Sequence, residues 1–114
     1  MKTSIIIPCY NEKSTIKEII EKVNLQKDIT KEIILVDDYS VDGTRSIIEN
    51  DLSDKVDKII LNDKNYGKGY SIRKGIEKSS GDIILIQDAD LEYDPNDYKK
   101  LIKPIEEGLA DVVF

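Results

Sequence analysis

The sequence contains no histidine and only one cysteine, Cys9, in 114 residues. The absence of histidine excludes Ser-His-Asp catalysis and histidine-based zinc sites. It also removes the usual base that would activate a cysteine nucleophile. A single cysteine excludes an internal disulfide and fits a reducing compartment. We therefore interpret Cys9 as a small buried residue at the end of a strand.

Long apolar runs and an excess of positive charge are also absent. No segment approaches the roughly 20 apolar residues that cross a membrane as a helix, and the start of the chain has no signal-peptide pattern, so we expect a cytoplasmic location. The formal net charge is −6, which argues against nucleic acid as a partner because phosphate backbones are bound by basic surfaces. An anionic ligand would need a cation or local hydrogen-bond donors.

The length of the chain suits a single domain over residues 1–114. The sequence stops at Asp111-Val112-Val113-Phe114, which reads as the start of a strand without a polar exit. We therefore expect the domain to be incomplete at its C-terminal end. An unfinished sheet edge would be open to pairing with another copy, which predicts a homo-oligomer.

Four short apolar runs predict strands that are buried on both faces, because each run is β-branched and continuous rather than alternating. They are Ser4–Ile7, Glu32–Val36, Lys58–Leu61 and Asp82–Ile86.

Helical spacing of apolar residues follows each of these runs. The expected helices are one that begins after a cap at Ser14 and carries Ile16, Ile19, Ile20 and Val23, one that follows Thr44 and carries Ile47, Ile48 and Leu52, one over about 68–78 with Ile72 and Ile76 facing inward, and one that carries Tyr98, Leu101, Ile102 and Ile105. The β-α-β order predicts an α/β fold with a mostly parallel sheet and helices on both faces.

Ligands of such sheets bind at the carboxyl ends of the strands. This rule selects four polar segments, 8–12, 37–40, 62–69 and 88–90. Asp88 and Asp90 would point the same way if the backbone stays extended, and such carboxylates suit Mg²⁺ or Mn²⁺ held together with substrate phosphates. The alternative is that Asp88-Ala89-Asp90 only ends a strand and starts a helix.

Two other segments have both a structural and a functional interpretation. In Asp37-Asp38, one carboxylate can accept a hydrogen bond from a base or ribose while the other holds the following turn, or both only terminate a strand. The glycines of Gly67-Lys68-Gly69 resemble those of phosphate-binding loops but lack the Walker spacing. Lys68 would contact the nucleotide or its phosphates, or it is an ordinary solvated lysine.

Taken together, these segments resemble family 2 glycosyltransferases across nearly the whole chain. The resemblance rests on four linked motifs, Ile5-Ile6-Ile7-Pro8-Cys9-Tyr10-Asn11-Glu12, Val36-Asp37-Asp38-Tyr39-Ser40-Val41-Asp42-Gly43-Thr44, Asn65-Tyr66-Gly67-Lys68-Gly69, and Gly81-Asp82 through Asp88-Ala89-Asp90. The likeness is greatest to the branch that transfers sugars to polyprenyl or dolichol phosphates, which the segment 88–95 suggests most.

The resemblance implies a Rossmann-like GT-A fold and inverting transfer of a sugar from a nucleotide-diphosphate donor. An acceptor in keeping with this branch is a polyprenyl phosphate, which would place the full-length protein at the cytoplasmic face of a membrane. By the same resemblance, the residues that contact the donor would be Pro8, Tyr10, Glu12, Val36, Asp37, Asp38, Lys68, Asp88 and Ala89.

The resemblance also implies roles within the acidic segment, where Asp88 and Asp90 would be the catalytic residues. Asp90 would be the principal ligand of a Mg²⁺ or Mn²⁺ that bridges the diphosphate, with Glu92 as a second ligand, and Asp88 would meet the ribose or the sugar. Such an ion would neutralise the charge of the departing nucleoside diphosphate. No catalytic base can be assigned, and an ionised acceptor phosphate would need none.

Three other interpretations stay open. A nucleotide-sugar-binding fragment or pseudoenzyme would keep the donor site without turnover. A phosphoacceptor receiver domain also has paired acids and Mg²⁺, but its acidic pair follows the first strand, whereas Asp37-Asp38 follows the second. A phosphatase of the haloacid dehalogenase type uses an Asp-x-Asp segment, but at its first strand.

Overall fold

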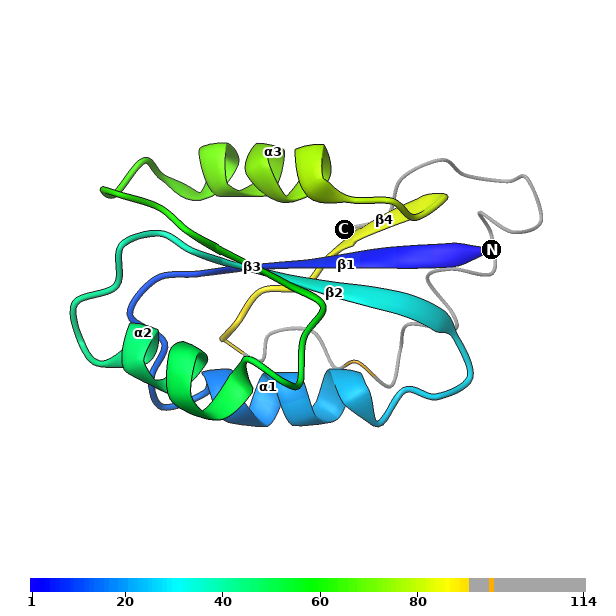
Figure 1. Ribbon diagram of the computed structural model, residues 1–114, viewed down its shortest axis with the longest axis horizontal. Helices are drawn as coiled ribbons and strands as arrows, with labels where there is room; N and C mark the ends of the chain where they lie inside the picture. Colours follow the sequence, from blue (N-terminus) through cyan, green and yellow to red (C-terminus); the bar gives the residue numbers. More distant parts are fainter. Residues whose placement is uncertain (91–94, 96–114) are drawn as a thin grey trace.

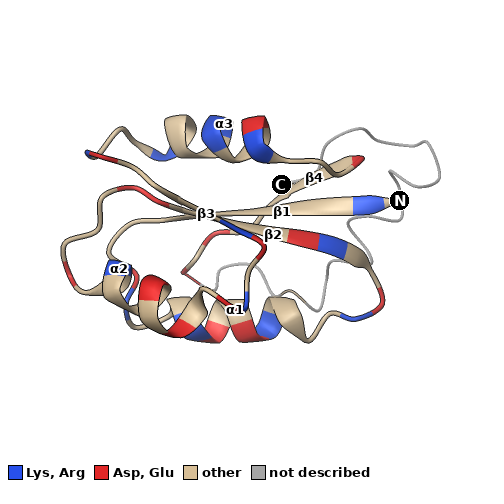
Figure 2. Ribbon diagram, in the orientation of Figure 1, with Lys and Arg blue, Asp and Glu red and all other residues tan. Residues whose placement is uncertain are grey.

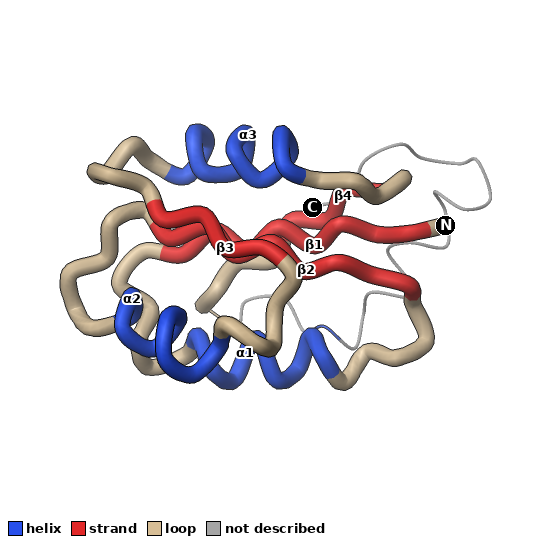
Figure 3. Tube along the Cα trace, in the orientation of Figure 1, coloured by secondary structure: helices blue, strands red, loops and turns tan. Residues whose placement is uncertain are grey.

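The computed structural model describes residues 1–90 and residue 95. Strands and helices alternate along the chain (Figure 3). The elements are β1 (Lys2–Cys9), α1 (Ile16–Asn24), β2 (Thr30–Asp37), α2 (Thr44–Ile47), the π-helical turn η1 (Ile48–Leu52), β3 (Lys58–Leu61), α3 (Lys68–Lys78) and β4 (Ile83–Ile86). The expected helix that carries Tyr98 to Ile105 and the expected strand at 111–114 lie outside the described residues.

The four strands form one parallel sheet, as predicted, and their order is β3-β2-β1-β4. β1 and β2 are longer than their apolar runs. Lys2 pairs with Thr30 at one end and Cys9 with Asp37 at the other. The extension is possible because polar residues also contribute a backbone N–H and C=O to the ladder.

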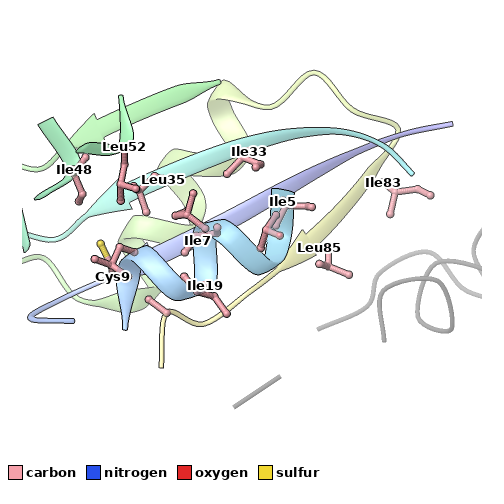
Figure 4. Packing of buried hydrophobic residues seen from close by; sticks show 14 residues of the cluster. Ile5, Ile7, Cys9, Ile19, Ile33, Leu35, Ile48, Leu52, Ile83 and Leu85 are labelled. Atoms are coloured by element: carbon pink, nitrogen blue, oxygen red, sulfur yellow. The ribbon is translucent and has the colours of Figure 1, made fainter. Parts of the chain in front are cut away.

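Alternate residues of the central strands face two helical layers. Figure 1 shows α1 and α2 on one side of the sheet and α3 on the other. Ile5 and Ile7 belong to the larger core cluster, which includes the buried residues of α1 and is drawn in Figure 4. Ile6 and Ile34 point the other way, into a smaller cluster against α3. Each buried isoleucine stabilises the fold by about 1.5–3 kcal/mol.

The helix α1 buries the four apolar residues that its spacing predicted. Its N-cap is Thr15 rather than the expected Ser14, and no side chain caps the helix. The Thr15 hydroxyl instead donates to the carbonyl of Ala89, 2.5 Å away, so a tertiary contact replaces the local one.

The predicted helix after Thr44 is present in two parts, because the α-helical turn α2 passes into the π-helical turn η1. Ile48 and Leu52 are buried in the larger cluster as expected, and Ile47 is partly buried against it.

The helix α3 has the predicted bounds, and Ile72 packs against the smaller cluster. The prediction that Ile76 also faces inward is wrong, since 44% of this residue is exposed. Gly75 occupies the inner face instead. A Cβ there would lie 2.5 Å from Cγ2 of Ile6, so the close approach of α3 to β1 requires glycine.

The edges of the described sheet are β3 and β4. Self-association through an edge and a single domain over 1–114 stay predictions. Within residues 1–90 and 95, no helix has the length and apolar character needed to cross a membrane.

The order of the strands positions the site. From β1 the chain moves to β2 and β3 on one side and then returns to β4 on the other, so the strand order reverses at β1. In parallel sheets a crevice opens at the carboxyl ends of the strands where the order reverses. These ends lie toward the left of Figure 1, opposite the N-terminus.

Candidate functional site

A cavity of about 390 Å³ lies at the carboxyl ends of the strands, beside the start of α3. It is lined by Pro8, Cys9, Tyr10, Glu12, Asp38, Asn65, Gly67, Lys68, Ser71, Asp88, Ala89 and Asp90. The structure therefore brings together all the predicted site residues in its described part except Val36 and Asp37. Glu92 lies outside the described residues.

Val36 and Asp37 do not line the cavity. Val36 is buried in the smaller core cluster against α3. Asp37 is also fully buried, and its carboxylate accepts hydrogen bonds from Arg45 Nε at 2.8 Å and from the backbone N–H of Ser40 at 3.0 Å. Asp38 directly follows β2, and its side chain is the one of this acidic pair that lines the cavity.

Asp38 organises the loop that precedes α3. Its carboxylate, 4% exposed, accepts hydrogen bonds from the backbone N–H of Tyr66 at 2.8 Å and of Gly67 at 2.9 Å. The side-chain amide of Asn62 donates to it as well, at 2.9 Å. Gly67 has φ +99°, which suits glycine. Charge-assisted hydrogen bonds of this kind are strong, so Asp38 determines the position of the cavity wall formed by Gly67 and Lys68.

The loops after β1 and β2 are joined by Asn11. Its side-chain oxygen accepts from the backbone N–H of Val41 at 2.8 Å, and its own N–H donates to Ser40 Oγ at 2.9 Å. Asn11 and Tyr39 are the two non-glycine residues with positive φ among those described. These constrained loops hold Tyr10, which is 46% exposed, at the rim of the cavity.

Asp88 forms an ion pair with Lys68, with 2.5 Å between Nζ and Oδ1. This contact joins the segment that follows β4 to the first residue of α3. The segments 62–69 and 88–90, which are separate in the sequence, therefore meet here. The extended backbone that would point Asp88 and Asp90 the same way is not present, because residues 89 and 90 form a turn. Ala89 is buried under the Thr15 hydroxyl, which draws this turn toward α1.

The carboxylates of Asp88 and Asp90 fit a divalent cation whose remaining ligands are phosphate oxygens. Among the residues described, no group of three or more Asp, Glu, His or Cys side chains could enclose a metal ion. Asp88 and Asp90 nevertheless line the same cavity, and Mg²⁺ is commonly held by one or two carboxylates plus substrate phosphates. Their oxygen ligands suit Mg²⁺ or Mn²⁺.

Cys9 also lines the cavity but has the properties of a structural residue. Burial, together with the negative charge of Asp37 and the hydrogen bond to it, raises the pKa of the Cys9 thiol. The thiol donates to Asp37 Oδ1 over 3.6 Å. The Cys9 thiolate is therefore suppressed, which agrees with its predicted role as a buried residue.

Two polar contributors, Thr15 and Ser71, lie outside the segments predicted from the sequence, and a third, Asn65, lies within segment 62–69 but was given no role of its own. Ser71 is fully buried, accepts from Asn62 Nδ2 at 3.1 Å and lines the cavity. Its spacing of three residues from Lys68 on α3 is the one local signal that could have found it. Thr15 and Asn65 act through contacts to distant backbone carbonyls, which no local pattern reports.

A larger groove, of about 1050 Å³, lies between α1 and the loop before β3. It is open, and its lining carries both positive and negative side chains. Among them, Lys17 Nζ and Asp51 Oδ2 form an ion pair at 3.0 Å. It lies away from the strand ends, so we place the site in the smaller cavity.

Comparison with known proteins points to one family. A family model described as glycosyl transferase family 2 matches residues 4–114. The chain is 35% identical over 109 residues to a dolichol-phosphate mannosyltransferase of Pyrococcus furiosus, covering 95% of this chain and 31% of that protein. It is 39% identical over 118 residues to an undecaprenyl-phosphate 4-deoxy-4-formamido-L-arabinose transferase of Yersinia pestis, covering 98% of this chain and 36% of that one. The chain thus spans about a third of the length of these relatives.

Solved structures share the fold. Residues 1–349 of S. aureus TarS, in complex with UDP-GlcNAc, superpose with a TM-score of 0.77 at 28% identity, over 94% of this chain and 32% of that one. The mannosyltransferase PcManGT of Pyrobaculum calidifontis, in complex with GDP-Man and Mn²⁺, superposes with a TM-score of 0.69 at 26% identity, over 77% of this chain and 27% of that one. The parallel sheet is therefore that of GT-A glycosyltransferases, as predicted.

Proposed function

Because the chain belongs to glycosyl transferase family 2, we propose that it forms the donor-binding part of an inverting glycosyltransferase that uses a nucleotide-diphosphate sugar. One observation carries this proposal. Loops from β1, β2 and β4 and the start of α3 bring Tyr10, Asp38, Lys68, Asp88 and Asp90 to one cavity where the strand order reverses.

The cavity offers separate groups for the base and for the diphosphate. The exposed ring of Tyr10 presents a face on which a base can stack, and Glu12 and Asp38 are acceptors for its N–H groups. For the diphosphate, Lys68 begins α3, where its ammonium and the helix N-terminus favour phosphate oxygens. The complexes of similar proteins with UDP-GlcNAc and with GDP-Man and Mn²⁺ support this class of ligand.

Asp88 and Asp90 would hold Mg²⁺ or Mn²⁺ together with the donor phosphates, and Glu92 is proposed as a further ligand. A bound cation of this kind supplies Lewis-acid stabilisation of the leaving diphosphate. Asp88 would also face the ribose or sugar hydroxyls. The carboxylates thereby serve an anionic donor through the cation and the hydroxyls, which explains an acidic pocket for a negatively charged ligand.

We propose a polyprenyl phosphate as the acceptor, in keeping with the similarity to dolichol-phosphate and undecaprenyl-phosphate transferases. An ionised phosphate attacks without a general base, so this acceptor requires no further carboxylate for proton transfer. A lipid acceptor also implies that the full-length enzyme works at the cytoplasmic face of a membrane.

Calorimetry of the 114-residue chain tests the donor site. UDP-, GDP- and CDP-sugars are titrated with and without Mn²⁺ into the unaltered chain, Asp90→Ala and Asp54→Ala. Asp54 is an exposed acid away from the cavity, so its variant controls for the loss of charge. We expect one donor to bind in a Mn²⁺-dependent way. The Asp90→Ala variant should bind this donor at least about tenfold more weakly, whereas Asp54→Ala should bind it like the unaltered chain. Binding that needs no metal, or equal binding by Asp90→Ala, would contradict the metal assignment.

The competing interpretation is that this chain binds the donor without turnover. Radiolabelled donor incubated with polyprenyl phosphate separates the two, since an enzyme releases free sugar or forms a glycolipid and a binding fragment does neither. Membership of the family argues against the receiver-domain and phosphatase interpretations.

A further inference from the structure

The ion pair between Lys68 and Asp88 joins two walls of the cavity. The lysine ammonium lies 2.5 Å from Asp88 Oδ1, although 58% of the Lys68 side chain and 21% of the Asp88 side chain are exposed. Lys68 is the first residue of α3, and the preceding residue, Gly67, is held by the Asp38 carboxylate. The ammonium is thus placed by the fold beside a carboxylate proposed to contact the cation and the donor.

We propose that Lys68 is a built-in counter-ion that competes with the divalent cation for Asp88 and passes to the donor phosphates when the donor binds. This inference rests on the proposed function. Two cations within ion-pair distance of one carboxylate repel each other, so cation binding at Asp88 weakens the contact with Lys68. Donor phosphates, which are anionic, then provide a second partner for the ammonium.

The consequence is coupling between the two ligands. Without nucleotide, the positive charge of Lys68 weakens cation binding at Asp88, so the affinity of the site for the cation is low. With a nucleoside diphosphate present, the same lysine contributes to phosphate binding, and the opposition is removed. Cation and donor therefore raise each other's affinity for the site. At a low cation concentration without donor, the site stays empty. The coupling must be reciprocal, since it is a property of the binding free energies.

The test measures the affinity for MnCl₂ from the electron paramagnetic resonance signal of free Mn²⁺, with and without UDP. The variants are Lys68→Met, Lys68→Arg and Lys64→Met. Lys64 carries the same charge close to α3, but its ammonium lies over the Tyr66 ring, 5.1 Å from the centroid, so it controls for the loss of charge alone. Lys68→Arg keeps the positive charge at the site.

We expect Lys68→Met to bind Mn²⁺ without UDP about two- to fivefold more tightly than the unaltered chain, the range for a part-exposed ion pair. The gain in Mn²⁺ affinity on adding UDP should shrink in this variant, while Lys68→Arg and Lys64→Met behave like the unaltered chain.

Equal effects of Lys68→Met and Lys64→Met would overturn the inference, because the change would then come from net charge. An unchanged Lys68→Met would also overturn it, while leaving the proposed function intact if Asp90→Ala still loses Mn²⁺ and UDP. An Asp90→Ala chain that binds both as before would instead remove the proposed cation site itself, and the inference with it.

Discussion

The carboxylate of Asp38 holds the backbone N–H of Gly67 at 2.9 Å, and this contact determines where α3 begins. It links the end of β2 to the start of α3 across 29 residues of sequence. The ion pair of Lys68 with Asp88 depends on it, since Lys68 follows Gly67 directly.

Replacement of Asp38 by asparagine should loosen the cavity wall formed by Gly67 and Lys68. The asparagine side chain would keep one acceptor oxygen and present an amide donor to backbone N–H groups, so we expect Asp38→Asn to lower the free energy of unfolding by about 2 kcal/mol. Urea denaturation followed by circular dichroism measures the change. Asp54→Asn, at an exposed position, should stay within about 0.5 kcal/mol of the unaltered chain. A stable Asp38→Asn protein with unchanged donor affinity would contradict the organising role of Asp38.

Gly75 provides a prediction with a matched control on the same helix. A Cβ at Gly75 would lie 2.5 Å from Ile6, whereas one at Gly69 meets only Arg73, at 3.7 Å. We expect Gly75→Ala to destabilise the chain by about 1–3 kcal/mol through overpacking. Gly69→Ala should stabilise it by up to about 1 kcal/mol, because alanine favours the helix. Thermal denaturation of the two variants measures the difference, and equal melting temperatures would contradict the close approach of α3 to β1.

Glu32 predicts how stability depends on pH. It lies near the amino end of β2, away from the cavity, where Figure 2 shows acidic and basic residues side by side. Burial opposes its ionisation, but hydrogen bonds from Ser4, Ser80 and Lys58 prevail and lower its pKa to about 2. Lys58 Nζ lies 3.1 Å from its carboxylate.

Because the folded pKa of Glu32 is below the ordinary value of 4.5, its contribution is fully present above about pH 4.5 and is lost as the pH falls toward 2. This contribution is on the order of 3 kcal/mol. We expect Glu32→Gln to be less stable at pH 7 and to show a flatter stability profile between pH 4.5 and 2 in urea denaturation. The exposed Glu49→Gln variant is the control. Parallel profiles for the Glu32 variant and the unaltered chain would show that Glu32 ionises normally.

Cys9 should resist alkylation in the folded protein. Burial and the proximity of Asp37 raise the pKa of its thiol, so little thiolate exists at about pH 8. We expect iodoacetamide to label Cys9 only after unfolding in urea, with mass spectrometry as the measurement. Rapid labelling of the native chain at this pH would instead indicate an accessible thiolate in the cavity.

Local sequence patterns were sufficient to predict those features of the fold that depend on residues close together in the chain. The bounds of α3 follow from Gly67 and from Ser79-Ser80-Gly81, and its burial of Ile72 follows from helical spacing. The spacing could not tell that Ile76 is exposed, because the inner face is decided by how closely Gly75 approaches Ile6 on another element.

The same division applies to the site. Four polar segments at strand ends, read with the rule for parallel sheets, were enough to predict from sequence where the cavity lies, because strand order and chain direction restrict where such loops can meet. Only the tertiary structure decided which of two adjacent acids faces the cavity, Asp38, and which holds a turn beneath it, Asp37. It also decided that Lys68 contacts Asp88, because ion pairs and hydrogen bonds between distant segments depend on how the elements pack and leave no periodic trace in the sequence.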